Sequence, residues 1–370
     1  MRVLVTGSAG FIGQNLCADL ALRPDATLLT YDAQDDPQRL ETLAAQADIV
    51  FHLAGINRPV DEAAYAGNMD LARRLTALLE RAGKAVPLVL ASSIQAALDN
   101  PYGRSKAAAE QAVFAYARAT GAPVYVYRFP NVFGKWCRPH YNSVVATFCH
   151  QAARGEPLRV DALDRRLTLL YIDDLLATFM AVLDGRIEAD NQNFCDASPT
   201  YSVTLGDLAD MIRGFAASRG DFTLRGDRTD PFVRKLYATF LSYLPQDGFA
   251  VPTIQHEDER GYFAELFRMP AFGQVSVSRT RPGIIRGQHW HHTKAEKFVA
   301  LQGQGVIRFR RVGDEAVLAY PVSGARVAVV DIPPGYTHHI ENTGDEDLIL
   351  LIWAGELFDP DRPDTHYLEV

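Results

Sequence analysis

The sequence predicts an α/β domain with a doubly wound parallel sheet, followed by an all-β domain that forms a barrel. The chain has 370 residues, which is enough for two domains of ordinary size. Up to about residue 235, apolar runs alternate with amphipathic helical stretches, and from about residue 249 short apolar runs recur between Gly/Pro turns. We therefore expect a first domain over residues 1–243 and a second over residues 244–370.

The first domain is expected to alternate strands with helices. Amphipathic stretches at Asn68–Arg81 and Ser105–Thr120 predict helices that lie between buried strands. This alternation is typical of βαβ units, in which helices cover both faces of a parallel sheet. The predicted buried strands are Val3–Val5, Leu28–Tyr31, Ile49–Leu53, Leu88–Ala91 and Val124–Arg128.

The second domain has a sequence pattern that predicts short strands. A connector over Asp230–Asp247 carries a helical patch, Phe232–Tyr243, between Pro231 and Pro245. Beyond it, apolar runs bounded by turn residues favour an antiparallel sandwich or barrel. The predicted strands are Gly273–Ser278, Lys297–Leu301, Val306–Arg310, Val327–Ile332 and Leu348–Trp353.

Composition and charge exclude several classes of protein. The formal net charge of -8 disfavours a general nucleic-acid binder, which would present a basic face. No apolar run reaches the ~18 residues of a membrane span, and the N-terminus lacks the pattern of a signal peptide. The cysteines have no CxxC spacing and are expected to be free thiols: Cys17, Cys137, Cys149 and Cys195. These features predict a cytoplasmic protein that neither binds nucleic acid nor inserts into a membrane.

A glycine-rich turn follows the first strand and opens a helix. Glycines let the backbone approach a pyrophosphate closely, and the N–H groups at the start of the helix can bind it. The turn reads Thr6-Gly7-Ser8-Ala9-Gly10-Phe11-Ile12-Gly13. Asp32 follows the second strand, where an acid can bind the adenine ribose 2′-OH. The pattern predicts a dinucleotide site, and Asp32 favours NAD over NADP.

A tyrosine and a lysine stand four residues apart, at Tyr102 and Lys106, behind the helix start Asp99-Asn100-Pro101. On a helix the two side chains share one face, and the ammonium is expected to lower the pKa of the phenol. A tyrosine tuned in this way can exchange a proton with a carbonyl oxygen. Ser92 and Ser93, at the end of a strand, could hold the same oxygen.

The second domain carries a histidine cluster. His289 and His291 lie in a strand-like stretch, so both imidazoles can face one ion. Glu296 follows after a short gap, and His338 comes 42 residues later along the sequence, beyond Pro333-Pro334-Gly335. Three imidazoles and one carboxylate suit Zn, Fe, Mn or Ni.

The first domain resembles the extended short-chain dehydrogenase/reductase family, whose members have a Rossmann fold and use Ser/Thr, Tyr and Lys in catalysis. The resemblance is carried by Thr6–Gly13, Asp48–Gly55 (DIVFHLAG), Ser92-Ser93, Tyr102–Lys106, Arg128–Gly134 (RFPNVFG) and Tyr171–Asp174 (YIDD). It implies that Leu53, Ala54, Gly55 and Lys106 also contact the cofactor. Many such relatives act on nucleotide sugars, which implies that Asn131 lies near the substrate and that Arg165 or Arg166 reaches its phosphates.

The second domain resembles the cupin family. The first cupin motif is met by Gly283, His289, His291, Glu296 and Gly303, and the second by Pro333, Gly335, His338 and Asn342. One glycine of the second motif is replaced by Val327, which affects a turn and not the ligands. His292 and His339 lie beside the ligands and are read equally well as proton carriers or as surface residues.

Over nearly its whole length the chain resembles the CapF family of bacterial surface-polysaccharide biosynthesis. The matching stretches are HLAGINRP (52–59), SSIQA (92–96), YNSVVATFC (141–149), LSYLP (241–245), RGQHWHHTKAEKF (286–298) and IPPGYTHHIEN (332–342). The resemblance implies a homodimeric enzyme on the route to N-acetyl-L-fucosamine. Its zinc-bearing cupin would epimerise C3 of a UDP-2-acetamido-2,6-dideoxy-4-keto-hexose, and its reductase domain would reduce the C4 ketone with NADPH to UDP-N-acetyl-6-deoxy-L-talosamine.

Some points stay open at this stage. The resemblance favours NADPH, whereas Asp32 favours NADH, and for a biosynthetic reduction we expect NADPH. Lys294, Tyr336 and His339 are candidates for the base that removes the C3 proton. One alternative is a single-activity NAD(P)-dependent 4-epimerase or reductase with a structural cupin. A dehydratase is disfavoured because Ile94-Gln95, after Ser93, cannot exchange protons. A non-enzymatic NAD(P)-sensing scaffold would not need Tyr102, Lys106 and Ser93 together.

Overall fold

The computed structural model describes residues 1–188 and 194–370, and these divide into two compact units. The first unit comprises Met1–Ile212 and Arg228–Pro245, and the second comprises Arg213–Asp227 and Gln246–Val370. The second unit therefore includes a segment from before the predicted boundary. The reason is local pairing, because the backbone of Phe222 and Leu224 exchanges hydrogen bonds with Arg268.

The first unit is built on a five-stranded parallel sheet in the order β2-β1-β3-β4-β5. Apart from the edge strand β2, its strands hold buried residues on both faces, so they read in the sequence as continuous apolar runs. The strands are β1 (Arg2–Thr6), β2 (Thr27–Tyr31), β3 (Ile49–His52), β4 (Leu88–Ser93) and β5 (Val124–Phe129).

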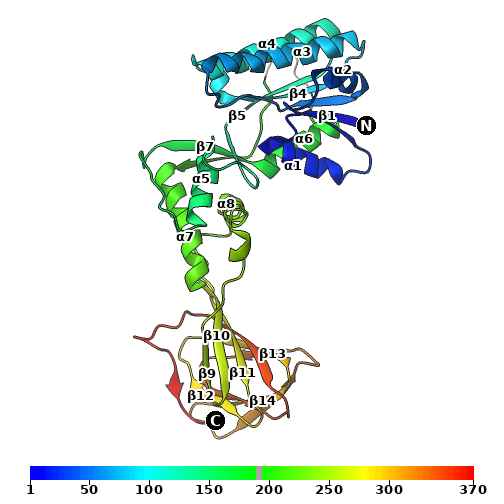
Figure 1. Ribbon diagram of the computed structural model, residues 1–370. Helices are drawn as coiled ribbons and strands as arrows, with labels where there is room; N and C mark the ends of the chain where they lie inside the picture. The colour runs from blue at the N-terminus through cyan, green and yellow to red at the C-terminus, as the bar shows by residue number, and fades with distance from the viewer. Residues whose placement is uncertain (189–193) are drawn as a thin grey trace. The chain divides into compact units, whose positions relative to one another are not determined.

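Helices cover both faces of this sheet. In Figure 1, α3 (Ala66–Arg81) and α4 (Pro101–Thr120) run side by side over one face, next to α2 (Pro37–Gln46). The other face is covered by α1 (Phe11–Ala21) and α6 (Ile172–Leu183). Each face encloses its own apolar core, because alternate residues of the strands point to opposite sides. The unit is the doubly wound, Rossmann-like domain that the sequence predicts.

The rest of the first unit adds a small sheet and further helices. The sheet has the order β6-β7-β8, with β6 (Asn131–Phe133), β7 (Arg166–Tyr171) and β8 (Thr200–Thr204). The helices are α5 (Val144–Ala152), α8 (Pro231–Leu241) and the first part of α7 (Leu205–Asp221), whose residues from Arg213 onward belong to the second unit. Lys235 of α8 lies 2.7 Å from the carboxylate of Asp174, in the predicted YIDD motif, so this acid holds α8 against α6.

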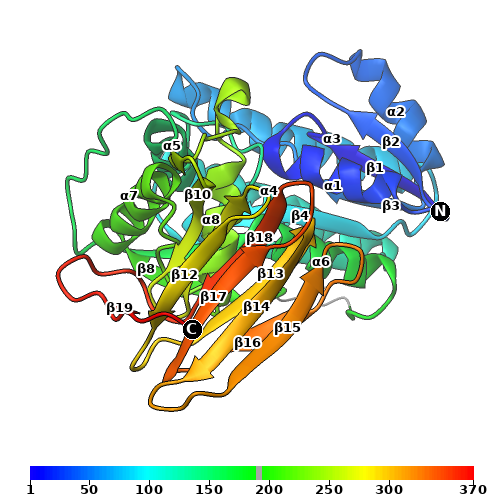
Figure 2. The same cartoon turned by 90° about the horizontal axis from the view of Figure 1, so that it is seen from below.

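The second unit is an antiparallel all-β domain of two sheets. One has the order β16-β13-β18-β11-β10-β9 and the other β15-β14-β17-β12-β19. Figure 2 shows β13 and β18 running side by side in the first of these sheets. The strands are β9 (Gln255–Asp258), β10 (Gly261–Met269), β11 (Gly273–Thr280), β12 (Ile285–Trp290), β13 (Glu296–Gln302), β14 (Gln304–Arg311), β15 (Val317–Ser323), β16 (Val329–Ile332), β17 (Tyr336–Asn342), β18 (Leu348–Ala354) and β19 (His366–Tyr367).

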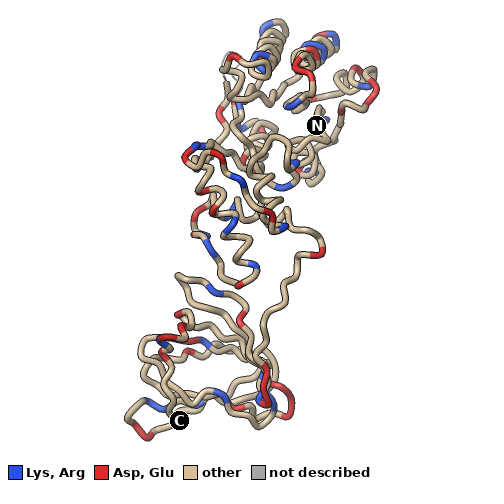
Figure 3. Tube along the Cα trace, turned by 60° about the vertical axis from the view of Figure 1, so that its left-hand side comes forward, with Lys and Arg blue, Asp and Glu red and all other residues tan. Residues whose placement is uncertain are grey.

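The core of the second unit includes side chains from both sheets. Phe298 and Leu350 come from one sheet, and Ile307 and Ile340 come from the other. Among the described strands the ladders stay two separate sheets, so the closed cupin barrel remains a prediction. No helix in the described part of the chain is long and apolar enough to cross a membrane. Acidic and basic residues are interspersed along both units (Figure 3).

Candidate functional site

The glycine-rich turn lies at the carboxyl end of β1, between β1 and β3, where the strand order of the sheet reverses. In open α/β sheets this switch point is where ligands bind. A Cβ on Gly7 would lie 2.6 Å from the Ala54 backbone, and one on Gly13 would lie 2.1 Å from the Gly7 carbonyl oxygen. Only glycine therefore fits at these two positions. The predicted residues Leu53 and Ala54 follow β3 directly beside the turn.

Asp32 lies at one end of this site. Its carboxylate accepts hydrogen bonds from the Ala9 amide at 3.0 Å and from the Ser8 hydroxyl. Gly10 caps the N-terminus of α1, whose first residues are Phe11 and Ile12. The turn, the open helix N-terminus and the acid after β2 together fit the pyrophosphate and ribose of a nicotinamide dinucleotide.

Tyr102 lies in the first turn of α4. The helix begins where the sequence predicts, because Asn100 accepts a hydrogen bond from the Gly103 amide at 2.7 Å and Pro101 occupies the first helical position. The Tyr102 hydroxyl donates to Asn57 Oδ1 at 3.1 Å and is hydrogen-bonded to the Ser93 side chain. The Tyr65 ring packs on Tyr102 with centroids 5.7 Å apart.

The protonation of this pair differs from the expectation. We expected Lys106 to lower the pKa of Tyr102, but burial raises it, and only the hydrogen bond with Ser93 opposes that effect. Burial also lowers the pKa of Lys106 to about 8. The Lys106 ammonium donates to the Ala91 carbonyl at 2.8 Å and lies beside Gly55, where a Cβ would be 3.4 Å away. Tyr102 thus stays protonated at neutral pH, as a proton donor must.

The two predicted serines have different environments. Ser93 contacts Tyr102, whereas Ser92 donates to the carboxylate of Glu110 at 2.5 Å. Glu110 is buried, stands one helical turn after Lys106, and is paired with Arg128 at 2.7 Å. Ser92 therefore belongs to the ion pair of Glu110 and Arg128, and Ser93 is the serine that lies beside Tyr102.

The predicted substrate-binding residues are on the small sheet of the first unit. Asn131 begins β6, Arg166 begins β7 and Arg165 directly precedes it, and all three side chains are exposed. Tyr141 lies close enough to Tyr102 to affect its pKa. The role of the three predicted residues in substrate binding stays a prediction.

The second unit brings the four predicted metal ligands together. One ligand atom each of His289, His291, Glu296 and His338 lies within 4.8 Å of the others. The strand β12 ends at Trp290, so His291 lies just beyond it and not inside a strand as predicted. The imidazole rings of His289 and His291 nevertheless lie close together, with their centroids 5.0 Å apart.

The donor atoms of this cluster fit a divalent metal. Nε2 of His291 and of His338 lies 3.3 and 3.4 Å from the Glu296 carboxylate. These three atoms are buried, and none of them has a conventional hydrogen-bond partner among the described residues. Burial lowers the pKa of His289 to about 4, and contacts with His291 and His338 outweigh burial to lower the pKa of Glu296. Three imidazole rings and an ionised carboxylate form the donor set of a zinc-type site.

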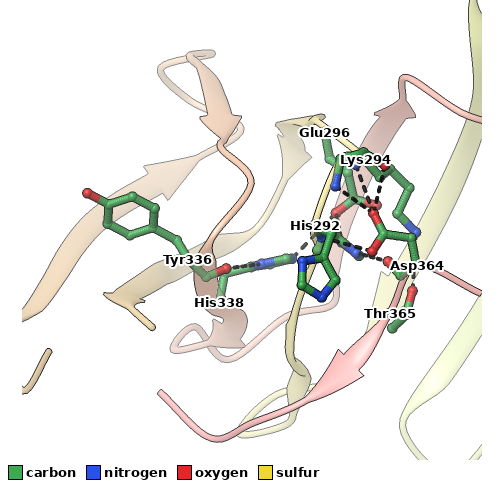
Figure 4. A network of polar contacts seen from close by, with 9 residues as sticks. His292, Lys294, Glu296, Tyr336, His338, Asp364 and Thr365 are labelled. Carbon is green, nitrogen blue, oxygen red and sulfur yellow. Dashed lines mark hydrogen bonds and ion pairs between the residues drawn. The ribbon is translucent and has the colours of Figure 1, made fainter. Parts of the chain in front are cut away.

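The C-terminal segment fixes the cluster from outside. The carboxylate of Asp364 accepts hydrogen bonds from three successive amides, those of His292, Thr293 and Lys294, at 2.8 to 2.9 Å. Its backbone carbonyl contacts Nδ1 of His291. Figure 4 shows Asp364 next to His292 and Lys294. Asp364 thus holds the turn that carries a predicted ligand and orients its ring.

A cavity of about 670 Å³ opens onto the cluster and is lined by His289, Glu296 and His338. Ligand pockets usually measure about 300–1,000 Å³, so this one is large enough for a nucleotide sugar. Of the three residues considered as the C3 base, only Lys294 lines the cavity. The Tyr336 phenol points away from Glu296 in Figure 4, and His339 bonds Gln288 and Arg308 instead.

Several functional residues escaped the sequence analysis. Asn57, Glu110 and Asp364 act through contacts between segments 18 to 73 residues apart, which no local spacing reveals. Asn57 lies within the quoted HLAGINRP stretch, so its position was visible but its contact with Tyr102 was not.

Two family models match the chain. The NAD dependent epimerase/dehydratase family covers residues 3–194, and the polysaccharide biosynthesis C-terminal domain covers residues 256–366. The first match contains the glycine-rich turn and the Tyr102/Lys106 pair, and the second contains the four clustered ligands.

Full-length relatives cover both units. UDP-2-acetamido-2,6-beta-L-arabino-hexul-4-ose reductase from Pseudomonas aeruginosa is 40% identical, over 100% of this chain and 99% of that protein. The crystal structure of capsular polysaccharide assembling protein CapF from Staphylococcus aureus is 44% identical, with a TM-score of 0.94 and 100% of both chains covered. A CapF structure with the inhibitor 3-isopropenyl-tropolone is 41% identical, again over 100% of both chains, with a TM-score of 0.89. The chain therefore belongs to the NAD-dependent epimerase/dehydratase family and, within it, to the CapF family.

Proposed function

We propose that the chain reduces the C4 ketone of a UDP-activated 4-keto-6-deoxy amino sugar with a nicotinamide cofactor. The observation that carries this proposal is the Tyr102 hydroxyl, held by Ser93 and Asn57 and kept protonated by burial. The 40% identical reductase from Pseudomonas aeruginosa supports the substrate class. The product would be UDP-N-acetyl-6-deoxy-L-talosamine, an intermediate for N-acetyl-L-fucosamine in surface polysaccharides.

The residues of the first unit then have distinct tasks. Ser93 and Tyr102 hold the C4 oxygen of the sugar, and Tyr102 donates its proton to that oxygen as the alcohol forms. Lys106 stabilises the phenolate that Tyr102 becomes, and it lies beside Gly55 where the ribose of the cofactor is expected. When bound, the nicotinamide supplies the hydride, and a divalent ion in the second unit supplies a Lewis acid.

The second unit is proposed to epimerise C3 of the same sugar before reduction. A proton next to a ketone becomes acidic when the ketone oxygen is polarised, so a cavity base can remove it and a proton can return on the other face. Lys294 is the candidate base that lines the cavity. A tropolone has two adjacent oxygen donors, so its use as a CapF inhibitor is consistent with a metal-dependent site.

We propose NADPH as the reductant and Zn²⁺ as the metal, with a homodimer in the cytoplasm as the working form. NADH and another divalent ion are the respective alternatives, because Asp32 suits a free ribose 2′-OH and the donor set accepts several metals. Comparing kcat/KM for NADPH with that for NADH decides the first choice. Metal analysis of the purified protein decides the second.

The decisive experiment follows the purified protein by NMR with the UDP-2-acetamido-4-keto-6-deoxy sugar in D₂O, without nicotinamide. Deuterium should enter at C3 and stop entering after chelation of the metal. Addition of NADPH should then give the C4 alcohol. Metal-loaded protein that incorporates no deuterium but still reduces the ketone would leave a single-activity reductase with a structural second domain. If the purified protein binds the cofactor but converts no 4-keto sugar, the protein would instead be a sensing scaffold.

A further inference from the structure

The cavity of the second unit has a second polar region besides the histidine cluster. Arg268 of β10 and Arg286 of β12 both line it, together with Lys294. The two arginines come from different sheets of the domain, so their approach to one cavity is a product of the fold. Neither arginine was singled out by the sequence analysis.

The guanidinium groups of these arginines are incompletely paired. Nε of Arg268 and Nε of Arg286 are buried, and neither has a hydrogen-bond partner anywhere in residues 1–188 and 194–370. Leaving a buried charged donor unsatisfied costs free energy, more than for a neutral donor. A buried donor without a partner calls for an explanation, and the cavity that both arginines line has room for an anionic ligand beside their guanidinium groups.

The carboxylates nearby do not supply the missing partners. Arg286 has one ion pair, 3.3 Å long, with Asp258, and Arg268 forms none with a described residue. Glu265 and Glu356 line the same cavity, but neither pairs with these arginines. The cavity wall thus offers planar guanidinium donors to an anion, and bidentate donors of this kind suit phosphate oxygens.

The position of Arg286 relative to the histidine cluster suits a nucleotide sugar. Arg286 and His289 line the cavity from the same strand, three positions apart, and the irregular pairing between Gly287 and His289 lets both side chains face the same side. In a nucleotide sugar the diphosphate is attached to C1, at the opposite end of the pyranose ring from C4. A sugar with its C4 oxygen at the cluster therefore extends its diphosphate along the cavity toward Arg286.

We propose that Arg268 and Arg286 form the diphosphate subsite of the second unit and bind the nucleoside diphosphate of the sugar substrate. This inference rests on the proposed C3 epimerisation for the identity of the ligand. It adds a separate prediction, namely that the second unit binds a UDP-sugar through these arginines whether or not the cluster holds a metal.

The test uses hydrogen–deuterium exchange of the full-length protein, titrated with UDP-N-acetylglucosamine as the probe. Peptides that contain β10, β12 and residues 356–365 should exchange more slowly as the probe binds. Arg268→Gln and Arg286→Gln should each raise the midpoint of this protection about tenfold or more, because each removes a charge-assisted hydrogen bond. Arg286→Lys keeps the positive charge but loses the planar guanidinium with its paired donors. Its midpoint should therefore lie between those of the unchanged protein and of Arg286→Gln.

Arg281→Gln is the matched control, since Arg281 is an exposed arginine of the same domain, paired with Glu257 and outside the cavity. It should leave the midpoint unchanged. No protection of the second unit by the probe, or equal midpoints in all variants, would overturn the subsite. Protection with arginine dependence but no deuterium at C3 would support the subsite and refute the epimerase, so the two proposals can fail separately.

Discussion

At the residue scale, burial sets the protonation of the groups around Tyr102. The phenol keeps its proton because burial raises its pKa, and Lys106 sits near the point of losing its own proton because burial lowers its pKa to about 8. In a reduction the tyrosine must begin as the acid and end as a phenolate beside a cation. The raised pKa of the phenol fits that direction of reaction, and Lys106 supplies the cation only at pH values below about 8.

Replacement of Tyr102 by Phe removes this proton while leaving the ring in place. We expect ketone reduction to fall about 100-fold or more, since general acid catalysis contributes about that much, while NADPH binding changes little. Tyr116→Phe is the matched control, because Tyr116 lies on the same helix and its hydroxyl bonds the Val86 carbonyl at 2.9 Å and contacts Thr120. Steady-state kinetics and cofactor titration check this, and unchanged turnover in Tyr102→Phe would remove the tyrosine from the mechanism.

The pH dependence of reduction follows from Lys106. Because its pKa is about 8, the ammonium that stabilises the phenolate is present below pH 8 and is lost above it. We expect kcat for reduction to be flat below this value and to decline above it, by up to about tenfold per pH unit. Lys106→Arg, which keeps its charge in this range, should move the decline to higher pH. A decline at the same pH in this variant would assign it to another group.

The two serines allow a paired comparison. Ser93→Ala removes a contact with Tyr102 and a cap on the Gln95 amide, so we expect kcat to fall roughly 100-fold with a loss of stability of about 1 kcal/mol. Ser92→Ala removes a hydrogen bond to the buried Glu110 carboxylate, so we expect the free energy of unfolding to fall by about 1.5–3 kcal/mol at nearly unchanged kcat. Denaturant unfolding and kinetics of both variants decide this, and the opposite pattern would make Ser92 the substrate-facing serine.

At the scale of elements, the central strands could be predicted closely from the sequence. Predicted Leu28–Tyr31 and Val124–Arg128 differ from β2 and β5 by one residue at one end. Strands buried on both faces read as apolar runs, and little else competes for that pattern. The strand β15 was missed because Pro321 interrupts its apolar run, and its first five positions are exposed. The two-residue β19 exists only through its pairing with β12.

The turn from His291 to Glu296 shows how an element depends on distant residues. Its amides are held by Asp364, which lies 70 or more residues away along the chain. Asp364→Ala should therefore lower the affinity of the cluster for Zn²⁺ by about 10- to 100-fold, as loss of an outer contact to a ligating histidine typically does. Asp361→Ala is the control, because it removes a nearby carboxylate and keeps the hydrogen bond that the Asp361 amide donates to Asp359. Competition with a metal-binding dye measures the affinity, and equal affinities in the two variants would refute this role for Asp364.

At the scale of the whole molecule, each candidate site lies within one compact unit. The residues around Tyr102 belong to the first unit, and the histidine cluster with its cavity belongs to the second. The residues of each site that could be predicted from sequence are those in short motifs, such as Tyr102 with Lys106 and His289 with His291. Asn57, Asp364, Arg268 and Arg286 could not be, because only tertiary packing brings them to the sites.

Because the two sites share no residue, loss of one activity should spare the other. His338→Ala removes a ligand of the cluster, so we expect deuterium incorporation at C3 to stop while the protein still reduces a 4-keto sugar that already has the epimerised C3 configuration. Tyr102→Phe should do the reverse, with C3 exchange retained and reduction lost. A mixture of the two variants should restore the complete reaction if the intermediate diffuses freely between chains. NMR of the products measures all three reactions, and loss of both activities in either single variant would show that the two sites do not work independently.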